Sequence, residues 1–219
     1  MPRERRASVA VPGAGAVRAI ATPAARPRWT CVYAPGAGSH IDDPFGVYLA
    51  ATLPARGVTM LRFEFPYMAA GRRAPDRPAV LEATWRVMLT RASADGQVVA
   101  AGRSMGGRIA SQVLASGARA DALALFAYPL HPPGKPGQAR DGHLASVPVP
   151  MLFCSGTRDT FASPDELRAL VRRLPRRARL HLLEGADHGF SVQKSTGRTR
   201  EDVWAEAAGA MMDWLTSLS

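Results

Sequence analysis

A serine lies between two glycines in the segment Gly102-Arg103-Ser104-Met105-Gly106, which follows an apolar run and precedes a helical pattern. This spacing is typical of a sharp turn from a strand into a helix that presents the serine hydroxyl as a nucleophile. Gly102 and Gly106 have no side chain, so the backbone can pass closely on both sides of the turn. An ordinary strand-to-helix turn would also explain the glycines, but the strand before and the helix after favour a nucleophilic Ser104.

A serine hydroxyl is a weak nucleophile unless a base takes its proton, and the base needs an acid to orient it. Asp159 follows the apolar run PMLFCS, and His188 follows the next run, ARLHLL. Because ligand sites in parallel sheets lie at the carboxyl ends of the strands, both side chains are expected beside Ser104. The sequence therefore predicts Ser104 as nucleophile, His188 as general base and Asp159 as the orienting acid.

Each of these assignments has an alternative. Asp187 is the second choice of acid, although its carboxylate is adjacent to His188 in the chain and would have difficulty turning onto that imidazole. Asp159 could cap the helix that begins near Ser163 and Pro164, but Ser163 is the better-placed cap. His188 could be a surface histidine, yet its position at a strand end between turn glycines favours the role of base.

Acyl transfer also requires N–H donors directed at the oxygen that becomes negative. The backbone N–H of Met105, just after the serine, is predicted to be one donor. The other is predicted in the turn PGAGS at residues 35–39, with Ala37 as first choice and Gly38 as the alternative. A glycine-rich turn could instead hold a phosphate, but the further glycine or Gly-Lys-Ser/Thr sequence of such sites is missing here.

Charged and aromatic residues are predicted to support and border the site. Arg103, beside the nucleophile, is predicted to pair with Glu64 at the end of the run VTMLRFE, with extension into solvent as the alternative. Tyr67, His131 and Phe190 are predicted to form the rim of a shallow pocket.

Short apolar runs alternate with longer helical patterns, which predicts an α/β fold with a mostly parallel sheet and helices on both faces. The predicted strands lie at residues 29–35, 58–64, 97–101, 122–128, 149–155 and 178–183. The predicted helices lie at residues 45–55, 78–93, 105–117, 164–174 and 200–217. Residues 5–22 are predicted to add one or two edge strands.

The connection at residues 129–148 joins two predicted strands without a long helical pattern. Prolines at positions 129, 132, 133 and 136 stiffen it. We therefore expect little or no cap over the site, which would be open. The length of 219 residues predicts a single domain over residues 1–219, with 1–28 the least certain part.

The formal net charge of +10 raises the possibility of a nucleic-acid partner. Lys135 and Lys194 are the only lysines, and the abundance of Arg, Ala, Gly and Pro suggests a coding bias instead. The arginine clusters have no interleaved aromatic residues, so we expect no nucleic-acid partner. No apolar run reaches the ~20 residues that span a bilayer, so no membrane partner is expected either.

Two further features concern compartment and cofactors. The basic start of the chain is followed by small residues, glycines and Pro12 rather than an uninterrupted apolar segment, so we expect a cytoplasmic protein. Cys31 and Cys154 lie inside apolar runs, where a thiol acts as a small hydrophobe. The sequence thus predicts no disulfide, no metal site and no cofactor.

Together the motifs resemble the small α/β hydrolases of the dienelactone-hydrolase-like kind, closest to bacterial relatives of the testis-expressed and NSL-complex hydrolase-like proteins. The resemblance extends over nearly the whole chain from Trp29 onward. It is carried by PGAGS (35–39), LRFEFPY (61–67), GRSMGGR (102–108), YPLHPPGKP (128–136), GTRDTF (156–161) and GADHGF (185–190). It implies the α/β-hydrolase fold without a large cap and the same roles for Ser104, Asp159 and His188.

The expected function is that of a serine hydrolase that acts on a carboxylic ester or related acyl compound through an acyl-enzyme. The expected partner is a small-molecule acyl substrate. A binding or scaffold protein that keeps the pocket without turnover is the main alternative, because a fold does not guarantee an activity. A weak nucleic-acid binder is the third possibility.

Overall fold

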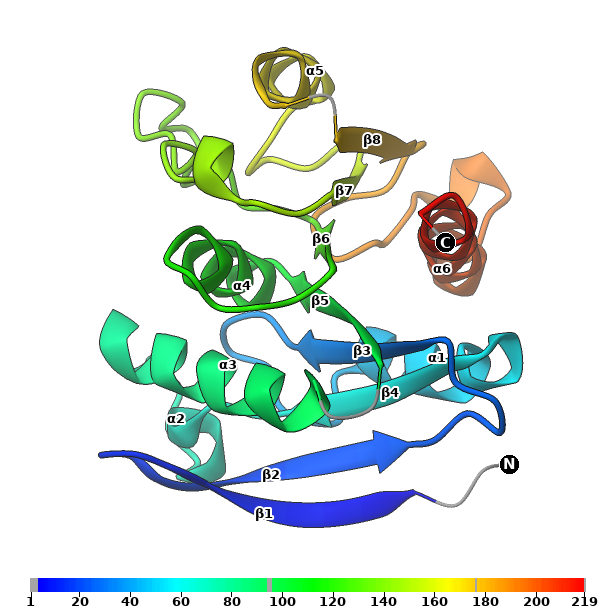
Figure 1. Ribbon diagram of the computed structural model, residues 1–219. Helices are drawn as coiled ribbons and strands as arrows, with labels where there is room; N and C mark the ends of the chain where they lie inside the picture. The colour runs from blue at the N-terminus through cyan, green and yellow to red at the C-terminus, as the bar shows by residue number, and fades with distance from the viewer. Residues whose placement is uncertain (1–3, 94–95, 176, 219) are drawn as a thin grey trace.

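A single eight-stranded sheet runs through the computed structural model, which describes residues 4–93, 96–175 and 177–218 (Figure 1). The strand order is β1-β2-β4-β3-β5-β6-β7-β8. Every pairing from β4 across to β8 is parallel, whereas β1 with β2 and β2 with β4 are antiparallel. The strands are β1 (Arg5–Val11), β2 (Gly15–Thr22), β3 (Trp29–Ala34), β4 (Val58–Phe63), β5 (Gln97–Arg103), β6 (Ala122–Phe126), β7 (Met151–Gly156) and β8 (Ala178–Leu183).

Helices cover both faces of the sheet. The α-helices are α1 (Pro44–Thr52), α2 (Pro66–Ala69), α3 (Pro78–Ala92), α4 (Met105–Ala115), α5 (Pro164–Arg173) and α6 (Arg200–Thr216). Apolar residues of α2, α3, α4 and α5 belong to one buried cluster, and those of α1 and α6 belong to another. Figure 1 shows α3 and α4 on one side of the sheet, with α1 and α6 on the other.

Alternation along the central strands divides the core between the two faces. Val32 and Ala34 of β3 contribute to the first cluster, while Cys31 and Tyr33 contribute to the second. All of β3 is buried, as a parallel strand covered on both faces must be. The two cysteine thiols are free and buried, in the apolar surroundings that their sequence context predicts.

The predicted elements match the observed ones apart from their ends, which differ by up to three residues. The edge strands predicted within residues 5–22 are the hairpin β1–β2, in which Val11 is paired with Gly15. The four-residue helix α2 has no counterpart in the prediction, because so short an element leaves no periodic pattern.

The α/β-hydrolase fold predicted from the sequence is present, and residues 4–93, 96–175 and 177–218 form no lid. Within residues 129–148, the structure has a short 3-10 turn at Leu144–Ser146 and otherwise irregular chain. This segment is tied to the rest of the protein by its backbone, since the His131 N–H donates to the Phe161 carbonyl at 3.1 Å.

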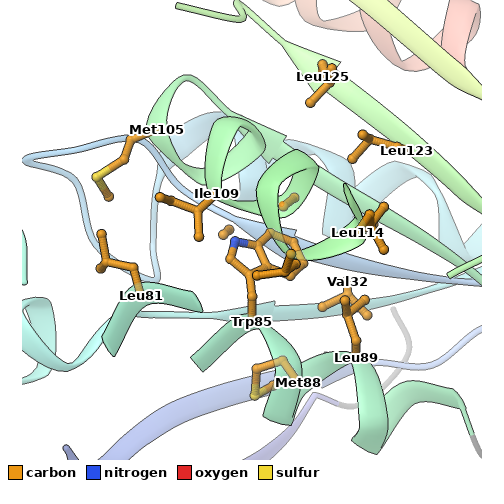
Figure 2. Close-up of a cluster of buried hydrophobic side chains, with 14 of the residues drawn as sticks. Val32, Leu81, Trp85, Met88, Leu89, Met105, Ile109, Leu114, Leu123 and Leu125 are labelled. Carbon is orange, nitrogen blue, oxygen red and sulfur yellow. The ribbon is translucent and has the colours of Figure 1, made fainter. Parts of the chain in front are cut away.

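Trp85 of α3 joins the core to the start of α4. Figure 2 shows its indole among Leu81, Met88 and Ile109, all of them buried. Its Nε1–H donates to the Gly106 carbonyl at 3.1 Å, so the largest side chain in this cluster also satisfies a carbonyl in the turn that carries Ser104.

Removing this hydrogen bond should lower the free energy of unfolding. Trp85→Phe removes the side-chain donor from the Gly106 carbonyl, which lies within α4 and keeps its helical partner, and we expect a loss of about 0.5–1.5 kcal/mol by urea titration. Trp85→Ala also opens a cavity and should cost about 3–5 kcal/mol. Trp204→Phe is the matched control, because within the described residues the buried Trp204 Nε1 makes no hydrogen bond. Equal losses for the two Phe variants would contradict a role for the Trp85 hydrogen bond.

Candidate active site

The turn from β5 into α4 holds Ser104 in a backbone conformation that side chains rarely adopt. Ser104 has φ 50° and ψ −118° and is the residue before the first residue of α4. Such a conformation costs about 1–3 kcal/mol and persists only where the surrounding structure holds it. Ser104 is fixed by its N–H, which donates to the Phe126 carbonyl of β6 at 2.8 Å, and by its own carbonyl, which accepts from the Arg108 N–H.

The two glycines that flank Ser104 are required by close backbone contacts. A Cβ on Gly102 would lie 2.3 Å from the Gly107 nitrogen, and a Cβ on Gly106 would lie 2.3 Å from the Ala34 carbonyl oxygen. Both contacts are with backbone atoms that cannot move aside. The strand, the turn and the helix therefore fit together only when these positions are glycine.

Three side chains from three loops form a continuous series of hydrogen bonds. Ser104 Oγ lies 2.9 Å from His188 Nε2, and His188 Nδ1 lies 2.8 Å from Asp159 Oδ2. A carboxylate only accepts hydrogen bonds, so Nδ1 carries the ring proton and Nε2 is left to accept the proton of the serine hydroxyl. The Asp159 side chain is fully buried, whereas that of His188 is 21% exposed.

Phe161 fixes both the acid and the imidazole. Its backbone N–H donates to Asp159 Oδ1 at 2.8 Å, and its ring stacks on the His188 ring with centroids 4.1 Å apart. The carboxylate and the imidazole therefore have one orientation each. The motif GTRDTF contains this phenylalanine, but no spacing rule connects it to the histidine, which follows a different strand.

Asp187 and Ser163, the residues of the alternative assignments, have partners of their own. Asp187 Oδ1 accepts the N–H groups of Gly189 and Ser191, both at 2.8 Å, so its carboxylate closes its own turn instead of facing His188. Ser163 caps α5 together with Glu166, so Asp159 is not needed as a cap.

The candidate oxyanion donors lie on either side of Ser104. Met105 begins α4, and Ala37 lies in the turn after β3; both border the same pocket as Ser104. In the described part of the chain, neither N–H donates a hydrogen bond. Gly38, the alternative donor, is not among the described residues that line this pocket, whereas Ala37 is. Ala37 is therefore the better-placed second donor.

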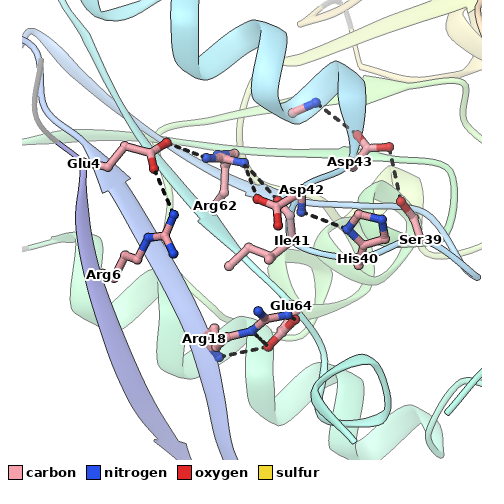
Figure 3. Close-up of polar contacts among 11 residues, drawn as sticks. Glu4, Arg6, Arg18, Ser39, His40, Ile41, Asp42, Asp43, Arg62 and Glu64 are labelled. Atoms are coloured by element: carbon pink, nitrogen blue, oxygen red, sulfur yellow. Dashed lines mark hydrogen bonds and ion pairs between the residues drawn. The ribbon is translucent and has the colours of Figure 1, made fainter. Parts of the chain in front are cut away.

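The predicted ion pair between Arg103 and Glu64 is wrong. Arg103 Nη1 lies 3.2 Å from Asp43 Oδ1, and the fully buried Glu64 carboxylate instead binds Arg18 of β2, with Nε to Oε1 at 2.6 Å. Figure 3 shows Glu64 turned toward Arg18. The reason is the antiparallel pairing of β2 with β4, which brings Arg18 beside Glu64 and could not be read from the short, interrupted sequence of β2.

Asp43 connects Arg103 to the turn that carries Ala37. This buried carboxylate accepts from the Tyr33 hydroxyl at 2.7 Å, from the Gly46 N–H at 3.0 Å and from the Ser39 hydroxyl at 3.3 Å. Figure 3 shows its contacts with Ser39 and with the start of α1. The sequence offers one signal for it, since an aspartate before Pro44 is typical of a helix N-cap. Its pairing with Arg103 is decided by the fold.

The pocket beside Ser104 has a volume of about 420 Å³. Its lining residues are Gly36, Ala37, Ser39, Pro75, Arg103, Ser104, Met105, Arg108, Pro129, Arg140, Phe161 and His188. Tyr67, His131 and Phe190, predicted as its rim, are absent from this lining and are buried. The sequence prediction missed the positions that replace them, chiefly Phe161, Arg108 and Arg140.

Each of the three predicted rim residues is drawn inward by a specific contact. Tyr67 lies in α2 and stacks on Phe65. His131 hydrogen-bonds through Nδ1 to the Pro132 carbonyl, which raises the pKa of its imidazole, and through Nε2 to Glu166 of α5. Phe190 has φ 61° and packs edge-on against Phe45, because the turn closed by Asp187 directs it into the core.

Nowhere in residues 4–93, 96–175 and 177–218 do three His, Cys, Asp or Glu side chains gather as a possible metal site. Over the same ranges, none of the helices combines the length and apolar character needed to span a membrane.

Comparison with known proteins identifies the family. Among solved structures, the chain is similar to an α/β serine hydrolase homologue from Coxiella burnetii (TM-score 0.72, 19% identity, 96% of this chain and 98% of that one). It is also similar to an α/β serine hydrolase without lid from Xanthomonas campestris (TM-score 0.75, 17% identity, 97% and 95%). A third similar structure is a dienelactone hydrolase from Anabaena variabilis (TM-score 0.77, 19% identity, 99% and 98%). At these identities the likeness concerns the fold. The family model described as alpha/beta hydrolase domain matches residues 27–216, and the chain belongs to that family.

Proposed function

We propose that this protein is a serine hydrolase that cleaves a carboxylic ester or a related acyl compound of low molecular weight. Two hydrogen bonds support the proposal. Ser104 Oγ lies 2.9 Å from His188 Nε2, and His188 Nδ1 lies 2.8 Å from Asp159 Oδ2. The narrower kinship with the testis-expressed and NSL-complex hydrolase-like proteins stays a prediction.

Acylation begins when Ser104 Oγ attacks the carbonyl carbon of the ester and its proton passes to His188 Nε2. The carbonyl oxygen becomes negative and is held by the N–H groups of Met105 and Ala37. Asp159 stabilises the imidazolium that forms. The tetrahedral intermediate then collapses, the bond to the alcohol oxygen breaks, and His188 Nε2 gives its proton to the leaving alkoxide.

Deacylation repeats these steps with water as nucleophile. His188 Nε2 takes a proton from the water as the oxygen attacks the acyl carbon, and Met105 and Ala37 again hold the oxyanion. The bond to Ser104 Oγ breaks, the serine regains its proton from His188, and the carboxylic acid leaves. The open edge of the pocket gives water access to the acyl-enzyme.

A fluorophosphonate probe distinguishes this hydrolase from a non-catalytic binding protein. The wild-type protein should be labelled covalently, because the probe reacts only with an activated serine. Ser104→Ala should not be labelled, while Ser111→Ala, at a buried serine of α4, should react like the wild type. The readout is intact-mass spectrometry. Failure of the folded wild type to react would favour the scaffold alternative.

Replacing each aspartate by asparagine should show whether Asp159 or Asp187 is the acid that orients His188. Asp159→Asn removes the acceptor that fixes the His188 tautomer, and we expect ester kcat to fall by about 10⁴-fold. Asp187→Asn keeps an oxygen that can accept from Gly189 and Ser191, so its activity should stay close to that of the wild type. Steady-state hydrolysis of 4-nitrophenyl butyrate measures both. The reverse order of the two effects would move the acid to Asp187.

Neutral esters with short acyl chains should react faster than long ones. The pocket of about 420 Å³ is bordered by irregular chain rather than by a helical cap, so a long alkyl tail finds little surface to contact. We expect kcat/KM for 4-nitrophenyl acetate and butyrate to exceed that for the dodecanoate by about tenfold or more. Assays below the aggregation concentration of the long ester test this, and an optimum at dodecanoate would contradict it.

A further inference from the structure

The pocket beside Ser104 is lined by three arginines, Arg103, Arg108 and Arg140, and among its described lining residues there is no aspartate or glutamate. A neutral ester needs no such surroundings. The charge of Arg103 is offset by Asp43 at 3.2 Å, and Asp159 lies behind His188. The positive charges of Arg108 and Arg140 therefore remain to be accounted for.

Arg108 and Arg140 have no carboxylate partner among the described residues. Arg108 Nη1 contacts only the neutral Gln112 Oε1, at 3.4 Å, and the Arg140 side chain makes no ion pair or hydrogen bond in that part of the chain. The nearest acidic neighbour, Asp141, binds Arg173 at 2.8 Å. Burial lowers the pKa of the Arg108 guanidinium, and the like charge of Arg140 lowers it further. Both cations therefore line the pocket, and the described residues supply a carboxylate to neither.

Both arginines are held in place by the fold. Arg108 lies one helical turn after Ser104, since its N–H donates to the Ser104 carbonyl at 3.0 Å, so it shares a face of α4 with the nucleophile. Both backbone polar groups of Arg140 are hydrogen-bonded. Its N–H donates to the Leu130 carbonyl, and its carbonyl accepts from the Tyr128 hydroxyl at 2.6 Å. The buried Tyr128 ring thereby brings the irregular connection, with Arg140, to the pocket.

We infer that the substrate carries, besides its scissile ester, an anionic group, a carboxylate or a phosphate, that binds between Arg108 and Arg140. This inference rests on the proposed function for the ester and adds the chemical class of the substrate. Guanidinium groups match the planar fork of such anions, and an anion between two like charges relieves their repulsion in a partly dehydrated pocket. The anion would bind within one helical turn of Ser104, and so would orient the carbonyl for attack.

Paired substrates test the inference. For an anion on the acyl side, mono-4-nitrophenyl adipate is compared with the neutral 4-nitrophenyl hexanoate. For an anion on the alcohol side, 4-carboxyphenyl butyrate is compared with the methyl ester of its carboxyl group. The adipate carboxylate is too distant to attack its own ester through a small ring. We expect one charged ester to be preferred, and the charged-to-neutral ratio of kcat/KM to fall about tenfold or more in Arg108→Gln and in Arg140→Gln.

The ratio cancels any general damage to the site, and matched variants control for charge. Arg119→Gln removes the same charge from an exposed residue after α4 that does not border this pocket, and should leave the ratio as in the wild type. Arg108→Lys keeps the charge and should restore part of the ratio. No preference for a charged ester on either side, or a loss as large in Arg119→Gln, would overturn the inference.

A binding measurement separates this inference from the proposed activity. In Ser104→Ala, adipate or inorganic phosphate should raise the midpoint of thermal unfolding in a saturable way, whereas adipamide should not. Arg108→Gln and Arg140→Gln in that background should abolish the shift. Should the wild type neither react with the probe nor cleave esters, a shift with these anions would still support an anion site, and its absence would overturn it. A response to phosphate but not adipate would identify the anion as phosphate.

Discussion

The close contact between the glycines around Ser104 and the backbone of neighbouring segments is the constraint on which the site depends. The left-handed conformation of Ser104 is costly by itself. It is maintained because Gly102 and Gly106 let α4 approach β5 and β3 within distances that no side chain permits. The Trp85 indole also donates a hydrogen bond to the Gly106 carbonyl. Ser104 is therefore positioned by the core of the sheet, and its geometry does not rely on a flexible loop.

Asp159 and His188 reach Ser104 because their own loops are in contact. A Cβ on Gly156, at the end of β7, would lie 2.1 Å from the Ala186 carbonyl oxygen after β8, and the Arg158 N–H donates to that same oxygen at 2.9 Å. The parallel register of β7 and β8 brings both turns to one edge of the sheet. Phe161 then adds a flat surface against which the imidazole rests. Strand pairing thus converts two distant sequence motifs into one hydrogen-bonded series.

Charge is distributed unevenly around this edge, and in a way that composition does not reveal. Asp43 takes up Arg103 and at the same time holds the turn that contains Ala37, so a buried carboxylate couples the residue beside the nucleophile to a candidate oxyanion donor. Arg62, buried in β4, is similarly compensated by Glu4 and Asp42 (Figure 3). Arg108 and Arg140, by contrast, have no carboxylate partner among the described residues. Their lack of compensation is a property of these two positions and does not follow from the overall positive charge.

The sequence by itself determined the strands and the α-helices other than α2, because local periodicity indicates each of them. It also predicted the three candidate positions Ser104, Asp159 and His188, because each lies in a turn after a strand. Other features were decided only by the tertiary structure. The partners of Arg103 and Glu64 depend on which segments are neighbours in the fold. The pairing of β2 with β4, for example, places Arg18 beside Glu64. The pocket lining depends on which way a turn faces, so Phe190 points inward while Phe161 lies against the imidazole. Such choices follow from packing between segments far apart in the chain, and no local pattern encodes them.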